Sequence, residues 1–249
     1  EPECWVLHPN DAWHGFGDIE DGYCMLDPIK VSISTPGIGP DGLGEMGVPA
    51  SILSAYLTAN GIIPEKTTDF TVLMLFSIGI TKGKWGTLID TLLKFKEDYD
   101  NNTSLEEVLP DVVKAAPQRY SGMGLRDLCK EMFAAMKELK TTEFMSEGFA
   151  VLPHPDMSPS SAYEQLVLDN VEKVDLDGVA ERTLATGIVP YPPGIPLIMP
   201  GENAGPADGP ALGYLKALEG FDRRFPAFEH DSHGVEVKDG KYYVTVLKK

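Results

Sequence analysis

The sequence has few cysteines, and their spacing supports neither metal binding nor redox chemistry. Cys4, Cys24 and Cys129 are an odd number of cysteines, and no two of them form a Cys-x-x-Cys pair. Zinc ribbons and disulfide-rich secreted scaffolds depend on such pairs or on an even framework. Both classes are therefore excluded, and we expect the chain to reside in a reducing, cytoplasmic compartment.

Long apolar runs are also missing. No stretch approaches the roughly 20 apolar residues of a membrane-spanning helix. The first residues, EPECWVLHPNDAWHGF, have neither the basic nor the apolar segment of a signal peptide. We expect no membrane partner.

Basic residues are scarce relative to acidic ones. The chain has 21 Lys and Arg against 38 Asp and Glu, which gives a net charge of -17 over 249 residues. Nucleic-acid binding needs clustered basic side chains, so this function is not expected. The acidic surface has two interpretations: it provides solubility, or it keeps subunits apart until acid protonates the carboxylates.

Motifs for common reactions are absent or incomplete. The segment GIGPDGLG (37–44) lacks the Gly-Lys-Ser/Thr of a phosphate loop and is interpreted as a connection. There is no Gly-x-Ser-x-Gly and no His-Glu-x-x-His. His230 and His233 precede a predicted strand, so we interpret them as a weak zinc candidate. Trp5, Trp13 and His14 are expected to form an aromatic cluster in the core.

The first hundred residues are patterned as a compact α/β unit. Strands are predicted at 29–34 and 70–78, the second apolar almost throughout and therefore expected to be covered on both faces. A Gly-rich loop (35–47) leads to a helix that has Pro49 in its first turn and is followed by Gly61. Its apolar stripe is expected to consist of Ile52, Leu53, Tyr56 and Leu57. Thr81 is expected to cap a second helix, so a small sheet would carry helices on one face.

Residues 96–104 form the best internal boundary, because the pattern then changes to short helices. Helices are predicted from residue 104, over 124–139, from Ser158 as N-cap, and over 210–225. The helix over 124–139 is expected to have one apolar face, formed by Leu125, Leu128, Cys129, Met132, Phe133 and Met136. A hairpin with Asp239-Gly240 at its turn ends the chain. Between them, GIVPYPPGIPLIMPGE (187–202) is too rich in proline for a helix or an interior strand.

Several ordered segments resemble one enzyme family. They are YCMLDPIKVSI, GVPASILSAYLTANGIIPEKT, LFSIGITKGKWGTL and PYPPGIPLIMPGE. The family is that of the bacterial inducible ornithine/lysine/arginine decarboxylases, which use pyridoxal phosphate and have the aspartate-aminotransferase fold. The segments CMLDPIKVSI, TTDF and TKGKWGTL look most like those of the acid-induced arginine decarboxylases, with lysine and ornithine as alternative substrates.

The resemblance implies a fold and a reaction. Residues 1–100 would be the small aminotransferase-like domain, and residues 101–249 the family's C-terminal domain, in an α/β chain. The reaction would convert arginine to agmatine and carbon dioxide and consume a proton. The partners implied are the amino-acid substrate, an upstream pyridoxal-phosphate domain of the same protein, and further copies in a homodimer or higher homo-oligomer.

One departure from the family concerns the cofactor. Members bind pyridoxal phosphate through a lysine that follows a histidine, and no lysine here does so. We therefore expect no catalytic, cofactor-binding or metal-binding residue in this segment, which would be inactive alone. The sequence begins without Met and in the middle of the family pattern, which favours an enzyme fragment. A stand-alone assembly or regulatory module with the same fold is the alternative.

The resemblance also assigns substrate contacts. Glu45 would bind the substrate's distal cation across the subunit interface, from a loop made pliant by Gly42, Gly44 and Gly47. Trp13 and His14 are assigned to the same site. The alternative for Glu45 is a solvated carboxylate favoured by the dipole of the next helix. The proline-rich ribbon would pack against the cofactor-bearing body or, equally, over its own domain.

Overall fold

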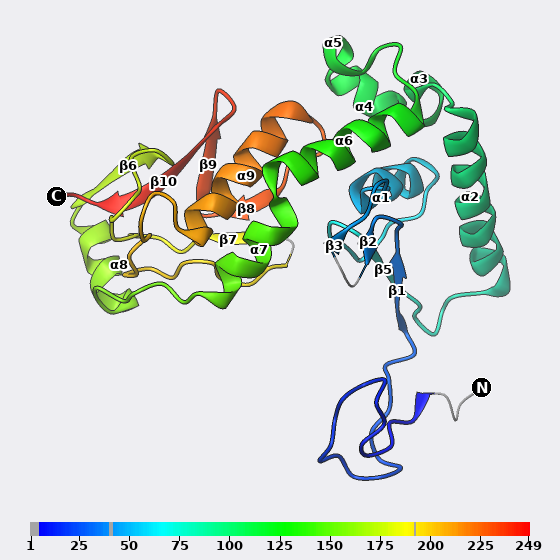
Figure 1. Cartoon of the computed structure of the whole chain (residues 1–249), viewed down its shortest axis with the longest axis horizontal. Helices are drawn as coiled ribbons and strands as arrows, with labels where there is room; N and C mark the ends of the chain where they lie inside the picture. The colour runs from blue at the N-terminus through cyan, green and yellow to red at the C-terminus, as the bar shows by residue number, and fades with distance from the viewer. Residues whose placement is uncertain (1–4, 40–41, 192) are drawn as a thin grey trace.

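The computed structural model describes residues 5–39, 42–191 and 193–249, and Cys4 lies outside them. Two packed units are joined along helix α6, and an N-terminal arm of residues 5–29 lies apart from both (Figure 1). Backbone hydrogen bonds from Leu7 to Cys24 and from Leu26 to Trp5 close the arm into a loop. The mixed α/β fold predicted from the sequence is confirmed.

The first unit contains a three-stranded antiparallel sheet of order β1-β5-β4. Its elements are β1 (Lys30–Ser34), β2 (Ile38–Gly39), β3 (Gly42–Leu43), α1 (Ala50–Ala59), β4 (Lys66–Thr67), β5 (Thr71–Leu75) and α2 (Lys82–Asn101). The predicted Gly-rich loop therefore includes a minimal hairpin, β2 with β3. Helix α1 buries the predicted apolar stripe, although Pro49 is its N-cap and does not lie within the first turn.

Strand β5 corrects one prediction. We expected it to be covered on both faces, but it is the central strand of an antiparallel sheet and one face is only partly covered. Val72 and Met74 are buried on the face that packs against α1, whereas Leu75 is 41% exposed. Helix α2 begins after Thr81 as predicted, but the Thr81 hydroxyl makes no capping hydrogen bond.

A helical segment connects the two units. It comprises α3 (Leu105–Val108), α4 (Pro110–Ala115), α5 (Pro117–Tyr120) and α6 (Leu125–Leu139). The predicted apolar face of α6 is confirmed, because all of its members are buried: Leu125, Leu128, Cys129, Met132, Phe133 and Met136. This wide apolar face lets one helix contact α2 and also α9 of the second unit.

The second unit has an antiparallel sheet of order β6-β10-β9 and a separate β7–β8 pair. Its elements are α7 (Thr141–Ala150), α8 (Pro159–Val167), β6 (Val171–Asp175), β7 (Val189–Tyr191), α9 (Pro210–Arg224), β8 (Asp231–His233), β9 (Val235–Lys238) and β10 (Lys241–Leu247). The Ser158 cap is confirmed, since its Oγ accepts from the Ser161 N–H at 3.2 Å. Asp239 and Gly240 have φ of 53° and 72°, as the predicted hairpin turn requires.

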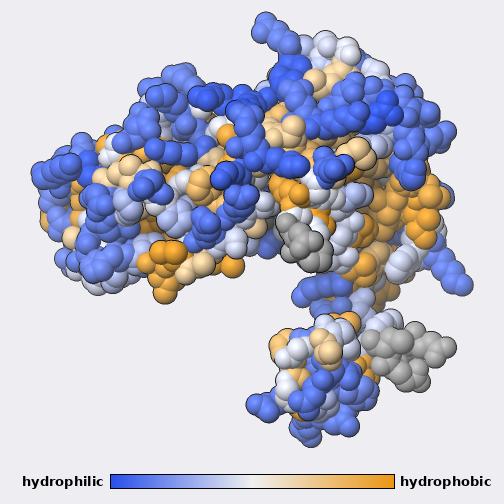
Figure 2. All heavy atoms as spheres, viewed as in Figure 1, coloured by the Kyte–Doolittle hydropathy of each residue, from blue (hydrophilic) through white to orange (hydrophobic). Residues whose placement is uncertain are grey.

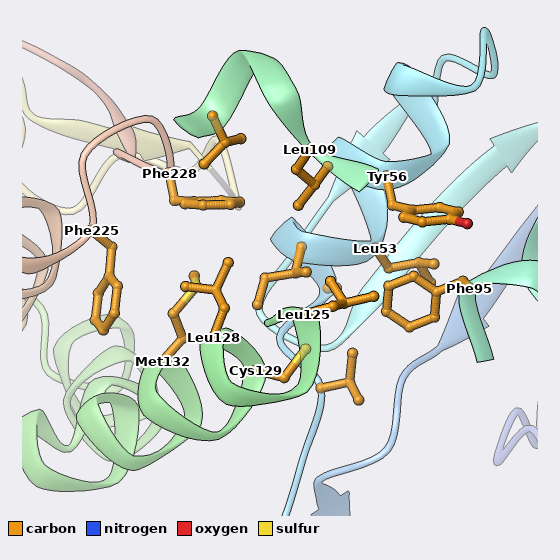
Figure 3. Packing of buried hydrophobic residues seen from close by; sticks show 14 of the residues in the cluster. Leu53, Tyr56, Phe95, Leu109, Leu125, Leu128, Cys129, Met132, Phe225 and Phe228 are labelled. Carbon is orange, nitrogen blue, oxygen red and sulfur yellow. The ribbon is translucent and has the colours of Figure 1, made fainter. Parts of the chain in front are cut away.

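Buried apolar side chains form two clusters. One lies between α1, α2, β5 and the helices up to α6, and the other fills the second unit. Three aromatic residues from the end of α9 and the loop after it belong to the first cluster: Phe221, Phe225 and Phe228. Figure 3 shows two of them beside Leu128 and Met132 of α6. The division at residues 100 and 101 stays a prediction.

The proline-rich ribbon packs mainly over its own unit. Leu197 and Ile198 are buried in the second cluster, where the Leu197 N–H donates to the Ile188 carbonyl at 2.9 Å. Ile195 and Met199 are exposed. The ribbon also reaches the first unit, because the Lys66 Nζ of β4 donates to the Pro193 carbonyl at 2.8 Å.

Candidate functional site

Glu45 lies in the loop that connects β3 to α1. Two backbone hydrogen bonds fix this loop: Gly44 N–H donates to the Gly37 carbonyl and Val48 N–H to the Pro36 carbonyl, each at 2.8 Å. Gly42 has a φ of +95°, which only glycine adopts without strain. The loop is therefore held by its backbone, and the exposed Glu45 side chain is free of a structural role in it.

Helix α6 forms the other wall of a cavity beside Glu45. The cavity has a volume of about 400 Å³ and is lined by Glu45, Met46, Gly47, Lys130, Phe133, Ala134 and Lys137. Lys137 Nζ donates to the Gly44 carbonyl at 2.7 Å and lies 5.6 Å from the centre of the Phe133 ring. Among the described residues, Glu45 itself has no ion-pair partner. Its carboxylate is available to a ligand.

The helix-dipole interpretation of Glu45 loses support from its position. The N-cap of α1 is Pro49, and no acidic residue lies in the first turn of that helix. Favourable interaction with a helix dipole falls off within the first turn. Glu45, four residues before the cap, lies too far away to gain much from it.

Trp13 and His14 lie in the N-terminal arm and form an exposed cluster. The Trp13 ring is 4.8 Å from that of His14, which stacks on Phe16 at 5.5 Å. His14 Nε2 donates to the His8 carbonyl at 2.9 Å, and Nδ1 accepts from the Phe16 N–H at 3.0 Å. The prediction that this cluster is core is wrong, because Trp13 is 56% exposed and Trp5 is 42% exposed.

The predicted substrate contacts do not form one site in this chain. Trp13 and His14 belong to the arm, and Glu45 follows β3 in the first unit, well apart in Figure 1. A ligand that touched all three residues would have to do so across separate segments or separate copies.

A buried polar network in the second unit was not predicted. His230 Nδ1 lies 2.6 Å from Asp222 Oδ1, the His230 N–H donates to the same oxygen at 3.1 Å, and the Tyr242 hydroxyl donates to Oδ2. Burial by itself lowers the pKa of His230, but the hydrogen bond and charge of Asp222, with Asp69 nearby, raise it above its usual 6.5. Asp222, His230 and Tyr242 lie on α9, the loop after it and β10, and they meet only because the chain folds back over α9, which no local spacing signals.

The remaining histidine and cysteine candidates are accounted for by their surroundings. His233 is exposed and lies 3.6 Å from Asp231, while His230 is committed to Asp222. Within residues 5–39, 42–191 and 193–249, no group of three His, Cys, Asp or Glu side chains is arranged to hold a metal. Burial raises the pKa of Cys129 to about 12, so this thiol is a protonated core residue.

The described residues do not fit pyridoxal phosphate. Its attachment needs a lysine amine that faces an enclosed pocket. Every described lysine is exposed except Lys66 and Lys216, which are partly exposed, and Lys66 donates to the ribbon. Lys130 and Lys137 line the cavity beside Glu45 but lie on the outer surface of α6. The described residues therefore do not provide an attachment point for the cofactor.

The chain is thus a mixed α/β segment in which a glycine-rich loop carries the Glu45 carboxylate beside a cavity. Among the described residues, this carboxylate has no ion-pair partner. Residues 1–84 match the Orn/Lys/Arg decarboxylase major domain, and residues 142–248 match the Orn/Lys/Arg decarboxylase C-terminal domain. The chain belongs to the Orn/Lys/Arg decarboxylase family.

Relatives with different substrates are similarly close. The chain is 47% identical over 247 residues to the biodegradative arginine decarboxylase of Escherichia coli (strain K12), which covers 99% of this chain and 33% of the relative. It is 48% identical over 237 residues to a lysine decarboxylase of Pseudomonas aeruginosa, covering 95% of this chain and 32% of the relative. The chain thus spans about a third of the length of the curated relatives it matches.

Solved structures of relatives share the fold. Lysine decarboxylase A from Pseudomonas aeruginosa has a TM-score of 0.89 at 46% identity, covering 99% of this chain and 34% of that one. The constitutive lysine decarboxylase of E. coli also has a TM-score of 0.89, at 37% identity, covering 100% of this chain and 35% of that one.

None of the described helices combines the length and apolar character needed to cross a membrane.

Proposed function

We propose that this chain is the C-terminal portion of a pyridoxal-phosphate-dependent decarboxylase that converts arginine to agmatine and carbon dioxide. The observation that carries the proposal is the end-to-end similarity to the biodegradative arginine decarboxylase, which extends over 99% of the chain. A lysine decarboxylase is as similar over 95% of the chain. The similarity therefore supports one reaction class for both substrates, and within that class we propose arginine.

Glu45 is the residue to which we assign the substrate's distal cation. Its carboxylate is exposed, unpaired among the described residues and held on a loop that backbone hydrogen bonds fix in place. A guanidinium presents a planar fork of N–H donors that pairs well with a carboxylate. We propose that Glu45 acts across the subunit interface, and that Trp13 and His14 of the arm contact substrate from a separate segment.

The cofactor is assigned to an upstream domain of the same protein. Support comes from an exposed apolar face on α2, where Trp85, Ile89 and Leu93 are 44%, 51% and 64% exposed. Figure 2 shows apolar side chains gathered on this side of the molecule. A face of this kind marks an interaction surface. The match of residues 1–84 to the major-domain family also favours an enzyme segment over a stand-alone assembly module.

The acidic surface suits a cytoplasmic, acid-responsive enzyme. Each decarboxylation consumes one proton, so the reaction would raise the pH around it and contribute to acid resistance. With 38 acidic and 21 basic residues, copies of the chain repel one another near neutral pH. We propose that the full-length protein is a homodimer that associates further in mild acid.

A substrate comparison with the full-length enzyme tests the proposal. Carbon dioxide release from arginine, lysine and ornithine should be measured after loading with pyridoxal phosphate. We expect arginine to have the highest kcat/KM by at least about tenfold, since a planar guanidinium can make two parallel hydrogen bonds to one carboxylate and the ammonium of lysine or ornithine cannot. A preference for lysine or ornithine would contradict the arginine assignment and leave the family intact.

A further inference from the structure

A small cavity lies where the two units meet. It has a volume of about 160 Å³ and is walled by the β4–β5 hairpin, the start of α1, the α6–α7 junction and the segment after α9. Its lining includes Asp69, Met136, Thr141, Phe221, Phe228 and His230. Neither the proposed reaction nor the Glu45 loop gives this space a role.

Asp69 brings an unpaired carboxylate to the cavity. Burial raises the pKa of Asp69 above its usual value, and the charge of His230 offsets part of this effect. Within the described part of the chain, no hydrogen-bond or ion-pair partner contacts the carboxylate. Asp69 is partly exposed at the cavity wall, so a ligand with N–H donors that enters the cavity can bond its carboxylate.

Thr141 supplies a second unpaired acceptor. Its side chain is only 3% exposed, it lines the same cavity, and its Oγ1 is buried with no hydrogen-bond partner among the described residues. Unsatisfied buried hydroxyls are rare in folded proteins. The Thr141 hydroxyl, which can donate or accept, therefore has unused hydrogen-bonding capacity in the cavity that Asp69 also lines.

The nearby positive charges are already committed. His230 Nδ1 lies 2.6 Å from Asp222 Oδ1, so its proton serves that carboxylate. Lys66, close to Asp69 in sequence, donates to the Pro193 carbonyl at 2.8 Å. The cavity wall thus holds two carboxylates, Asp69 and Glu229, beside His230, whose charge acts on Asp69 as well as on Asp222.

The opposite wall is apolar and limits the size of a ligand. Met136, Phe221 and Phe228 contribute it. A cavity of about 150 Å³ holds a molecule of about six heavy atoms. A metal ion would need more ligands than this cavity offers. Among residues 5–39, 42–191 and 193–249, no three His, Cys, Asp or Glu side chains lie close enough together to bind one.

We propose that this cavity binds a small primary amine, with its ammonium group donating to Asp69 and Thr141 and its alkyl chain against Met136, Phe221 and Phe228. An ammonium has three N–H donors, which suit the carboxylate and hydroxyl oxygens that line this cavity on Asp69, Glu229 and Thr141. The proposal is independent of the proposed decarboxylase substrate, because it concerns a cavity in this chain that can be tested without turnover.

Nuclear magnetic resonance titration of the 249-residue chain with ethylammonium chloride tests the site. We expect saturable shifts of the amide signals around Asp69, Thr141 and His230, with a Kd on the order of 1 mM for so small a ligand. Tetramethylammonium has the same charge but no N–H donor, and should leave these signals unchanged at the same ionic strength.

Two variants separate binding from general charge effects. Asp69→Asn should weaken ethylammonium binding at least about tenfold, and Thr141→Val, which keeps the shape, about threefold or more. Asp208→Asn is the matched control, since Asp208 is an exposed loop aspartate away from the cavity. Far-ultraviolet circular dichroism checks that each variant is folded.

The proposal is overturned by any of three results. These are no saturable shift with ethylammonium up to about 50 mM, some fifty times the expected Kd, an equal response to tetramethylammonium, and unchanged binding in folded Asp69→Asn. The Thr141→Val variant provides the second measurement should Asp69→Asn fail to fold, and unchanged affinity in Thr141→Val would count equally against the site.

Discussion

The Tyr56 hydroxyl donates a hydrogen bond of 2.6 Å to Asp98 Oδ2, joining α1 to α2 through the first core. Tyr56 is 1% exposed and its ring packs edge-on against Phe95 at 5.1 Å. Asp98 also accepts from the Thr103 hydroxyl at 3.0 Å, where the chain leaves α2. One buried carboxylate thus connects two helices and the start of the following segment.

The first prediction concerns this hydrogen bond. Tyr56→Phe keeps the ring but leaves Asp98 short of one donor, so we expect a loss of about 1–2 kcal/mol in the free energy of unfolding. Urea unfolding of the chain measures it. Tyr163→Phe, at an exposed position on α8, is the control and should change stability by less than about 0.5 kcal/mol. Equal stability of the two variants would contradict the role assigned to Tyr56.

The second prediction concerns two glycines. A Cβ at Gly47 would meet the Phe133 ring and lie 2.9 Å from Gly37 Cα, so Gly47→Ala should destabilise the chain by about 2 kcal/mol or more. A Cβ at Gly86, inside α2, meets nothing within 4 Å. Gly86→Ala should therefore stabilise the chain by about 0.5–1 kcal/mol. Thermal melts of both variants would show shifts of opposite sign, and shifts of the same sign would contradict the packing.

The third prediction is a pH dependence set by His230. Its pKa is raised in the folded chain, because Asp222 and Asp69 favour the protonated ring more than burial opposes it. The protonated ring thus stabilises the fold fully below the unfolded pKa of about 6.5, and this stabilisation is lost as the pH rises through the folded pKa. Urea unfolding midpoints should fall as the pH increases above about 6.5.

A variant isolates that effect. His230→Gln removes the titrating ring, so the decline above pH of about 6.5 should be reduced, at a cost of roughly 1–2 kcal/mol at lower pH. His233→Gln, at an exposed position in the same segment, should leave the profile unchanged. A wild-type profile that stays level or rises over this range would refute the assignment.

The fourth prediction tests Glu45 in catalysis. In the full-length enzyme, Glu45→Gln keeps the shape and removes the charge, so we expect a loss of about 2–4 kcal/mol in transition-state binding, roughly 30- to 1,000-fold in kcat/KM for arginine. Glu164→Gln on α8 is the matched exposed control. Near-normal turnover of Glu45→Gln would make Glu45 an ordinary loop residue.

The fifth prediction concerns assembly. The net charge of -17 implies strong repulsion between copies, which weakens as carboxylates approach their pKa values of roughly 4. Sedimentation of the full-length enzyme should show larger species near pH 5 than near pH 8 at low salt. Added salt should reduce the difference by screening. A single sedimenting species that does not change between pH 5 and pH 8 would contradict this prediction.

Local patterns predicted the helices well. The stripe of α6, the Ser158 cap and the Asp239-Gly240 turn each depend on side chains a few residues apart, and each is confirmed. Helix α7 and strand β6 were not predicted. Strand β6 alternates only weakly and carries charged residues, and its antiparallel pairing with β10 cannot be read from this local pattern.

Predictions that needed distant contacts fared worse. The sequence of β5 is apolar enough for a doubly covered strand, and only the antiparallel sheet leaves Leu75 exposed. Trp5 and Trp13 are large and aromatic, yet the arm that carries them lies apart from both cores in this chain. The Asp69 and Thr141 cavity joins two units, so no local spacing could have indicated it.

The aromatic side chains at the end of α9 also set an order of events during synthesis. The first core contains Phe221, Phe225 and Phe228, which leave the ribosome long after α1, α2 and α6 have emerged. Loops that long make closure slow, and an N-terminal unit usually folds before the rest of the chain exists. Here α1, α2 and α6 must wait, with apolar surface uncovered, until the residues up to Phe228 have been translated. A nascent chain stalled before Phe221 should therefore bind chaperones more strongly than one that has passed Phe228.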